Sequence, residues 1–276
     1  MVTCPIDLFA TATVELSHGS GRVFSPPGSP KAAHAVKRSL SYLGRGDLDA
    51  RVGLDSPLPR GKGMASSTAD IVAAISAVAA ALNARLSARE QAELALGIEP
   101  SDGVMIPGVA LFDHRRGQIA QSLGHPPHMR VLVLEFAGSV HTQAFNAADR
   151  AAAIGPQASR FEEAVEFIGT GLKGGDPQLI GRGATISTVA HQTVLPKPQL
   201  PAVLGLCRQS GASGVNAAHS GTVLGLLFPD DAERISWARR RAWKRLRHLV
   251  SVRERRLIGG GVIVGAGASR CAAGGT

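Results

Sequence analysis

The spacing of hydrophobic and polar residues predicts strands and helices in two groups along the chain. The first group has a strand over 4–16, a loop over 17–30, a helix over 31–43, a strand over 50–55, a turn over 57–63 and helices over 68–82 and 87–96. The second has strands over 108–122, 130–136, 223–228 and near 257–264, a loop over 211–222, and helices over 159–174, 177–193 and 200–210. Such alternation favours an α+β or α/β fold with two layers.

Two of these helices carry further signals. In the helix over 68–82, Ile71, Ile75 and Val78 fall on one face, and small residues around them allow close packing. The helix over 87–96 begins with Ser87 and has Glu90 three residues later. This spacing predicts a capping box, in which the two side chains bond each other's backbone amides.

The segment that leads into the helix over 68–82 is rich in glycine and hydroxyl groups. It reads P-R-G-K-G-M-A-S-S-T-A-D over residues 59–70. Gly61 and Gly63 let the backbone turn tightly, and a helix amino-terminal end attracts anions, so the segment suits a polyphosphate. Ser67 and Asp70 have the spacing of a helix-capping pair. By composition alone, an ordinary glycine-rich turn before a buried helix explains the segment equally well.

The same segment resembles the second motif of the GHMP kinases, with Ala65 where that family usually has a glycine. Its form over 62–71 is similar to the L-threonine kinase branch of the family. Three further blocks resemble that branch in the same order, so that the likeness extends over about residues 3–264. They are residues 98–102 with 111–114, residues 192–198 and residues 214–226.

The resemblance implies a two-domain GHMP kinase fold of the α+β class. We expect an amino-terminal ATP-binding domain over 1–126, a ferredoxin-like carboxy-terminal domain over 127–265 and a disordered tail over 266–276. The implied reaction is ATP-dependent phosphorylation of L-threonine, with Mg²⁺, for cobalamin synthesis. The alternatives are a GHMP kinase for another small alcohol such as homoserine, and an inactive relic that still binds nucleotide.

The resemblance also implies roles for individual residues. Ser66 or Ser67 is expected to hold Mg²⁺ with Glu99, and Asp102 is the candidate base. The expected acceptor-binding residues are Asn216, His219, Ser220 and Gly221. The expected ATP-binding residues are Pro59, Gly61, Lys62, Gly63, Met64, Ala65, Ser66, Ser67 and Thr68.

Several of these residues also fit plainer roles. Glu99 and Asp102 suit a capped turn before a strand, and Asp113 with His114 suits a turn between strands. His219 suits a structural position as well as a substrate contact. Lys197, between two prolines, suits either the acceptor carboxylate or a solvated turn.

The family's first motif would precede residue 4. We therefore expect this chain to lack the opening strand and motif of the ATP-binding domain. An unpaired edge on the strand over 4–16, a tendency to aggregate and weak activity towards threonine would follow.

Composition and charge narrow the function classes. The 276 residues carry a net charge of +9, and ten basic residues against three acidic ones lie between Asp231 and Arg256. Trp237, Ala238, Ala242, Leu246 and Leu249 recur there at helical spacing, which predicts a basic helix with one apolar stripe. A solvated helix face or an anionic partner explains the charge, and we expect no nucleic-acid partner.

The remaining composition points to the cytoplasm. The three cysteines lie far apart, which argues against a disulfide framework or a structural zinc site. No run of about 18 apolar residues suggests a membrane span. The sequence leaves the oligomeric state open.

Overall fold

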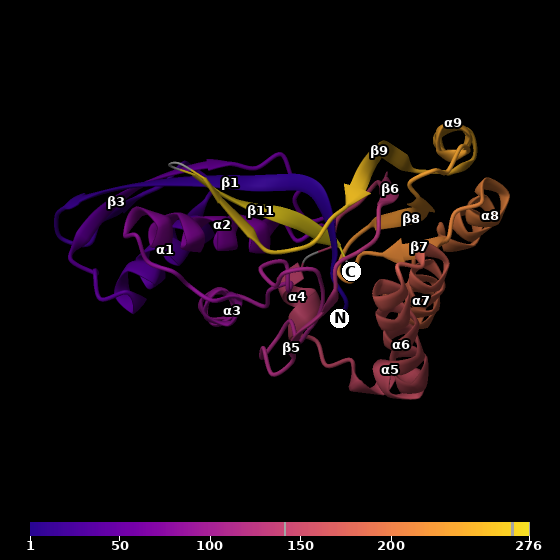
Figure 1. The fold of residues 1–276 in the computed structure, drawn as a ribbon, viewed down its shortest axis with the longest axis horizontal. Coiled ribbons are helices and arrows are strands. Elements are labelled where there is room, and N and C mark those ends of the chain that lie inside the picture. The colour runs from indigo at the N-terminus through magenta and orange to yellow at the C-terminus, as the bar shows by residue number, and fades with distance from the viewer. Residues whose placement is uncertain (141, 266–267, 276) are drawn as a thin grey trace.

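The structure is a computed structural model that describes residues 1–140, 142–265 and 268–275, and its fold is mixed α+β (Figure 1). The strands are β1 (Cys4–His18), β2 (Val23–Phe24), β3 (Leu48–Asp55), β4 (Val109–Phe112), β5 (Ala120–Gly124), β6 (Met129–Phe136), β7 (Gly214–Ala217), β8 (Val223–Pro229), β9 (Leu249–Leu257), β10 (Val262–Gly265) and β11 (Ala268–Gly275). The helices are α1 (Pro30–Tyr42), α2 (Ser66–Ala81), α3 (Ala88–Leu96), α4 (Thr142–Ala147), α5 (Ala151–Ile154), α6 (Ala158–Gly174), α7 (Pro177–Ala190), α8 (Leu200–Ser210) and α9 (Ile235–Arg245), with short 3₁₀ turns η1 (Gly155–Gln157) and η2 (His191–Thr193).

One sheet runs through both halves of the chain. Within the described residues it has nine strands, with the main path β10-β11-β1-β9-β6-β8-β7 and with β3 paired to β1 and β2. β4 and β5 form a separate antiparallel pair. The amino-terminal and carboxy-terminal strands meet where Ile6 of β1 pairs with Leu257 of β9. Helices α1 and α2 pack on the amino-terminal part of the sheet, and α7 and α8 pack on β7 and β8 (Figure 1).

The hydrophobic pattern explains this arrangement. Helix α2 is buried over nearly its whole length, and Ile71 and Ile75 have no exposed surface. Its alanines let β1 and α1 approach it closely. Residues 131–134 of strand β6 are all apolar because both faces of the strand are buried. Val131 and Val133 belong to one cluster of buried apolar residues, and Leu132 and Leu134 belong to another.

The predicted α+β class is confirmed, and most predicted elements are present. The capping box of α3 is also confirmed, because the Ser87 amide donates to Glu90 Oε2 at 2.8 Å and the Glu90 amide donates to Ser87 Oγ at 3.2 Å. Helix α2 begins two residues earlier than predicted, at Ser66. The start of α3 thus follows from a local signal, whereas that of α2 does not.

Three predicted elements were wrong in form. The single strand predicted over 108–122 is the hairpin of β4 and β5, because the Asp113 carboxylate accepts backbone amides and turns the chain. The loop predicted over 211–222 contains β7, which pairs with β8. The basic run is divided between two elements, because α9 ends at Arg245 and the last arginines lie on β9.

The predicted disordered tail was also wrong for residues 268–275, which form β11. This strand pairs antiparallel with β1, from Cys4 opposite Gly275 to Ala12 opposite Ser269. β3 pairs with β1 over its later half. The exposed edge expected on the strand over 4–16 is therefore covered in the described residues. The small residues of β11 suit this position, because Cys271, Ala272 and Ala273 are buried against α2.

Two clusters of buried apolar residues support the sheet. One joins α1, α2, α3 and β1 with residues of β6, α6 and β9, and the other lies among α8, α9 and the strands β6 to β9. The domain boundary expected at residue 126 falls between β5 and β6, and it stays a prediction because the sheet and the first cluster continue across it.

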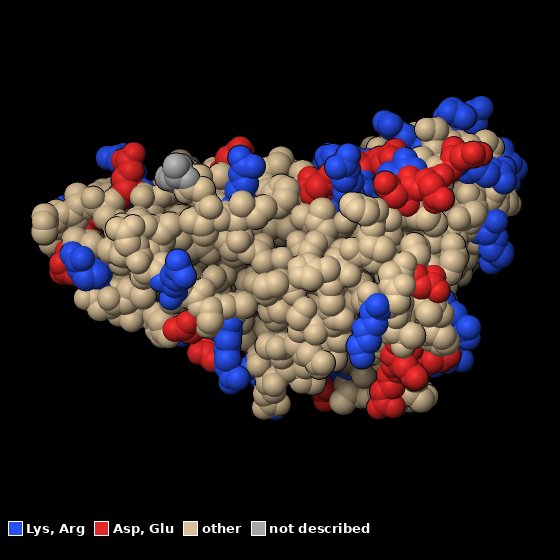
Figure 2. Space-filling model, in the orientation of Figure 1, with Lys and Arg blue, Asp and Glu red and all other residues tan. Residues whose placement is uncertain are grey.

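The basic side chains gather at one end of the molecule. Figure 2 shows them around α9, with acidic side chains beside them. Among these, Arg130 lies 3.1 Å from Glu254 and 3.7 Å from Asp230. In the described part of the chain, no helix is both long and apolar enough to span a bilayer.

Candidate active site

The segment before α2 forms a cradle of left-handed backbone. Gly61, Gly63 and Ala65 have φ angles of 70°, 81° and 53°. Ala65 is the N-cap residue of α2, and within the described residues it gives the helix end no side-chain cap hydrogen bond. The amides of the first helical turn are therefore free of a side-chain cap. The partial positive charge of the helix end is available to an anion.

The predicted capping pair of Ser67 and Asp70 was wrong. Because α2 begins at Ser66, Ser67 lies inside the first turn, and its hydroxyl bonds to other groups. Asp70 is buried, and its Oδ1 has no hydrogen-bond partner among the described residues. Burial raises the pKa of the Asp70 carboxyl above its ordinary value.

Three side chains from separate elements meet beside this helix end. Lys31 Nζ, from the first turn of α1, donates to Glu99 Oε2 at 2.6 Å and to Ser67 Oγ at 3.0 Å. The Ser67 hydroxyl donates to Glu99 Oε1. The structure thus brings together Ser67 and Glu99, as the resemblance implied. Sequence reasoning missed Lys31, because nothing in the helical periodicity distinguishes it from other lysines.

Asp102 lies on the same side of the site. Its backbone amide donates to Thr68 Oγ1 at 3.1 Å, which ties the segment after Glu99 to the first turn of α2. Burial raises the pKa of the Asp102 carboxyl to about 7, and the neighbouring Glu99 charge adds to the rise. A carboxyl with such a pKa is suited to accept a proton near neutral pH.

The 218–221 loop packs directly on the cradle. A Cβ atom at Gly63 would lie 2.5 Å from Ala218 Cβ and 2.9 Å from Gly221 Cα. A Cβ atom at Gly221 would clash with the Lys62 carbonyl oxygen. Glycine is required at both positions because the two backbones touch. Lys197 also stabilises the loop, since its buried Nζ donates to the Gly221 carbonyl at 2.8 Å.

The position of Lys197 excludes one of its two alternatives and leaves its binding of the acceptor carboxylate a prediction. Its side chain is buried, so it is not a solvated turn residue. Burial lowers the pKa of its ammonium to about 8. Lys62 is similarly engaged, because its Nζ donates to the carbonyls of Phe136 and Gly138 at 2.9 and 2.8 Å. Both lysines therefore join the halves of the site.

A cavity of about 550 Å³ opens above the cradle, and we call it the cradle cavity. It contains most of the residues that the sequence singled out. The predicted residues that line it are Gly61, Gly63, Met64, Ala65, Ser66, Ser67, Thr68, Glu99, Asp102, His219 and Ser220. Lys31 and Arg60 line it as well. Pro59, Lys62, Asn216 and Gly221 do not belong to its lining.

His219 separates the cradle cavity from a second cavity of about 320 Å³, which we call the apolar cavity. The His219 ring centroid lies 4.8 Å from that of His114 and 5.2 Å from those of His191 and Phe145. Burial lowers the pKa of His219 to about 2 and those of His114 and His191 to about 4. These three rings are therefore neutral at physiological pH, and His114 is more than a turn residue.

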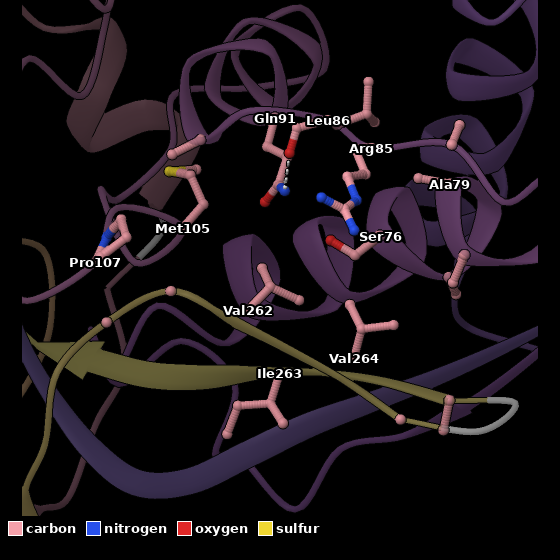
Figure 3. A pocket seen from close by; sticks show the side chains of 18 of the residues that line it. Ser76, Ala79, Arg85, Leu86, Gln91, Met105, Pro107, Val262, Ile263 and Val264 are labelled. Atoms are coloured by element: carbon pink, nitrogen blue, oxygen red, sulfur yellow. Dashed lines mark hydrogen bonds between the residues drawn. The ribbon is translucent and has the colours of Figure 1, made fainter.

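A third and larger cavity, of about 1130 Å³, lies apart from this site. Figure 3 shows Ser76, Arg85 and Gln91 on one side of it, with Val262 and Val264 pointing towards them from β10. Gln91 Nε2 donates to the Leu86 carbonyl at 3.0 Å. This cavity shares no lining residue with the cradle cavity, so the predicted chemistry is not located there.

The donor set at the cradle fits a hard cation that is shared with a ligand. Ser67 and Glu99 supply a hydroxyl and a carboxylate, the oxygen donors that Mg²⁺ prefers. Among the described residues, no group of three His, Cys, Asp or Glu side chains is placed to hold a metal ion. A Mg²⁺ ion at Glu99 would thus take its other ligands from phosphate oxygens and water.

Comparisons with known proteins agree with this geometry. Residues 30–110 match the family model of the GHMP kinases N terminal domain, and residues 165–245 match that of the GHMP kinases C terminal domain. The chain is 31% identical over 240 residues to an L-threonine kinase of Citrobacter freundii, covering 86% of this chain and 83% of that protein. It is 32% identical over 228 residues to an L-threonine kinase of Salmonella typhimurium, covering 83% and 75%.

Solved structures share the fold at lower sequence identity. A homoserine kinase from Cytophaga hutchinsonii superposes with a TM-score of 0.72 at 18% identity, over 98% of this chain and 96% of that one. The L. major mevalonate kinase in complex with R-mevalonate has a TM-score of 0.67 at 14% identity, over 94% and 89%. These two structures show the shared fold alone.

Proposed function

The chain belongs to the GHMP kinase family and is an ATP-dependent kinase, and on that premise we propose that it phosphorylates L-threonine to O-phospho-L-threonine. The observation that carries the proposal is the similarity to two L-threonine kinases over more than four fifths of this chain. We place the reaction in the cytoplasm and in the supply of the aminopropanol part of cobalamin. We also retain the proposed division into domains at 1–126 and 127–265.

The cradle would hold the ATP phosphates. Gly61 and Gly63 have no Cβ atoms, so their left-handed backbone can approach a ligand closely, and the uncapped start of α2 offers amides and a positive dipole end. Lys31 adds a positive charge at the same wall of the cavity. These groups would neutralise charge on the transferred phosphoryl group, which phosphoryl transfer requires.

Ser67 and Glu99 would hold Mg²⁺, with Ser66 beside them in the first turn of α2. When bound, the ion would neutralise charge between the β- and γ-phosphates. In the present structure the Lys31 ammonium donates to the Glu99 carboxylate. It would turn towards phosphate oxygens when a cation binds that carboxylate. The chain therefore supplies one carboxylate and one hydroxyl.

Asp102 would act as general base. Its carboxylate would take the proton from the threonine hydroxyl as the oxygen forms a bond to the γ-phosphorus and the bond to the ADP oxygen breaks. Because burial raises the pKa of this carboxyl to about 7, it is a stronger base than an ordinary aspartate. Thr68 would orient it through the Asp102 amide.

The 218–221 loop would close the acceptor side. Ser220 and His219 line the cradle cavity together with Glu99 and Asp102, and Gly221 lies against the cradle. His219 is neutral, so it would contribute a hydrogen bond rather than a charge. Asn216 lies on the wall of the apolar cavity, behind His219.

A second candidate acceptor is L-homoserine. The specific observation in its favour is the homoserine kinase fold neighbour, with a TM-score of 0.72. At 18% identity this neighbour carries the fold alone, so the L-threonine kinases at 31% and 32% identity outweigh it for the acceptor.

A substrate panel tests the proposal. Purified protein with ATP and Mg²⁺ would be assayed for ADP release with L-threonine, L-homoserine, L-serine and D-threonine, and the product would be identified by phosphorus NMR. We expect the highest kcat/KM for L-threonine. A higher kcat/KM for L-homoserine would make L-homoserine the acceptor in place of L-threonine. ATP binding without any turnover would favour the inactive relic.

A further inference from the structure

The apolar cavity behind His219 is larger than a threonine side chain requires. It measures about 320 Å³, at the lower end of the range of about 300–1,000 Å³ for pockets that hold drug-sized ligands. It lies between helices α6 and α7 on one side and residues 1–4, β4 and β7 on the other. The side chain of threonine ends in a single methyl group beside its hydroxyl.

Most of the lining of this cavity is apolar. Phe161, Val165, Ile168, Leu172 and Ile180 are among its residues. No described side chain in the lining is a carboxylate, a lysine or an arginine, and the ammonium of Met1 donates to the Phe112 carbonyl at 2.8 Å. A ligand ammonium would lose its hydration there without a carboxylate to pair with, which is costly.

The lining also holds polar atoms that lack partners. Both ring nitrogens of His191 are buried without a hydrogen bond in the described structure, and the His191 ring lies 5.2 Å from that of His219. Among the described residues, Asn216 Oδ1 in the lining is also buried without a partner. Buried polar atoms in native proteins are normally paired, so these atoms point to a ligand with a polar group near His219.

His219 links this cavity to the chemistry. It lines both cavities, and Asp102 and Ser67 lie on the walls of the cradle cavity. An acceptor whose hydroxyl is held at Asp102 would keep its charged groups on the open cradle side. Its uncharged substituent would pass His219 and enter the apolar cavity.

We propose that the apolar cavity receives an aliphatic substituent on the hydroxyl-bearing carbon, so that the substrate class is β-hydroxy amino acids with hydrocarbon groups larger than the threonine methyl. This inference rests on the proposed function, because it takes a β-hydroxy amino acid as the acceptor. It adds a specificity site that includes Ala184 and Phe161, two residues that no motif marks.

A series of acceptors with increasing substituents tests the inference. L-Serine, L-threonine, L-3-hydroxynorvaline and L-3-hydroxyleucine, each with the threonine configuration at the hydroxyl carbon where it is chiral, place hydrogen, methyl, ethyl and isopropyl at this position. Each buried carbon should raise kcat/KM by about fourfold. A fall in kcat/KM from threonine to hydroxynorvaline would overturn the inference and leave the proposed function intact.

Variants locate the effect. Ala184→Leu fills the cavity and should lower kcat/KM for hydroxyleucine at least tenfold relative to that for threonine. Phe161→Ala enlarges it and should shift preference towards hydroxyleucine. Val189→Leu, at an exposed position of α7 outside the cavity, is the matched control and should change neither value. Unchanged ratios in both cavity variants, with circular dichroism showing intact folds, would overturn the inference.

If no amino acid is phosphorylated, the proposed function fails, and the inference is judged by binding. Calorimetry would then measure the affinity of the same series for the ADP-bound protein. Affinity that rises with substituent size and is lost in Ala184→Leu would support the cavity assignment. Affinity that does not rise would overturn it.

Discussion

Lys31 and Glu99 form an ion pair of 2.6 Å beside the start of α2, with the Ser67 hydroxyl bonded to both. The Glu99 side chain is only 12% exposed, whereas that of Lys31 is 42% exposed. The lysine is thus the more solvent-exposed partner, and it places a positive charge where the proposed Mg²⁺ would bind. Lysine and metal ion would compete for the same carboxylate.

This competition predicts the effect of Glu99→Gln. Loss of the carboxylate removes the only acidic ligand proposed for Mg²⁺, so kcat should fall by about 10²-fold and half-saturation should require more Mg²⁺. Mg²⁺ titration of the initial rate at saturating ATP checks both values. Glu93→Gln, at a surface ion pair with Arg89 on α3, is the control. An unaltered Mg²⁺ titration would argue against the assignment.

Asp102 predicts a pH dependence. Burial raises the pKa of its carboxyl to about 7, and the base must be ionised, so kcat/KM should rise with pH to a plateau with a midpoint near 7. Asp102→Asn should abolish this titration and lower kcat by about 10²–10⁴-fold. A pH profile that is unchanged in the variant would exclude Asp102 as the base.

The same group predicts a stability trend of opposite sign. The ordinary pKa of 3.8 is raised in the folded protein, so the native state binds more protons than the unfolded state between about pH 4 and pH 7. The contribution of Asp102 to the free energy of unfolding is therefore present below about pH 4 and is lost as the pH rises through 7. Urea unfolding measures this trend. The free energy of unfolding of Asp102→Asn, relative to that of the wild type, should be higher at pH 8 than at pH 5.

Ala65 predicts a stabilising substitution. It has φ 53° and ψ 26° at the N-cap of α2, in a region that alanine adopts at a cost of roughly 1–2 kcal/mol. Ala65→Gly should raise the free energy of unfolding by about 1 kcal/mol. Ala80→Gly, within α2, should instead lower it by about 1 kcal/mol. If Ala65→Gly and Ala80→Gly lowered the free energy of unfolding equally, as measured with urea, the backbone strain assigned to Ala65 would be contradicted.

Much of the fold follows from local sequence. The period of β1, the apolar run of β6 and the cap of α3 each report an element whose own residues decide its form. The form of β11 was not predictable in this way. Its small residues carry no strand pattern, and its strand depends on pairing with β1. The basic run was misjudged because the same arginines suit an exposed helix face and an exposed strand face.

The residues of the site also separate into those that local sequence predicts and those that it does not. Residues of the cradle motif were predictable, because glycines and hydroxyls before a helix have a local chemical meaning. Lys31, His114 and His191 were not recognised, since each acquires its role from a residue distant in sequence. Lys31 meets Glu99 and Ser67, and the two histidines meet His219. Asn216 was expected to bind the acceptor, and it lines the apolar cavity rather than the cradle cavity.

Substitution of Lys62 tests whether this residue has a structural role or contacts phosphate. Its ammonium donates to two carbonyls at the end of β6 and lies 3.4 Å from Glu135 Oε1, so Lys62→Met should lower the free energy of unfolding by about 1–3 kcal/mol. Lys37→Met, on the exposed face of α1, is the control and should change it little. Lower ATP affinity with unchanged stability would instead place Lys62 at the phosphates.

Gly63 offers the most direct test of the contact between the two loops. A side chain there would meet Ala218 and Gly221 of the 218–221 loop, and φ is 81°, so Gly63→Val should separate the loops. We expect weaker ATP binding in calorimetry together with a lower Tm, because the same contact holds the two halves of the chain.

The matched control is Gly44→Ala, since Gly44 has φ 71° and nothing lies within 4 Å of an added Cβ. It isolates the cost of left-handed backbone, roughly 1–2 kcal/mol, from the steric effect. A lower Tm in both variants with weaker ATP binding only in Gly63→Val would assign the binding defect to the loop contact. Equal ATP affinity in Gly63→Val and the wild type would show that the cradle does not need the 218–221 loop to hold phosphate.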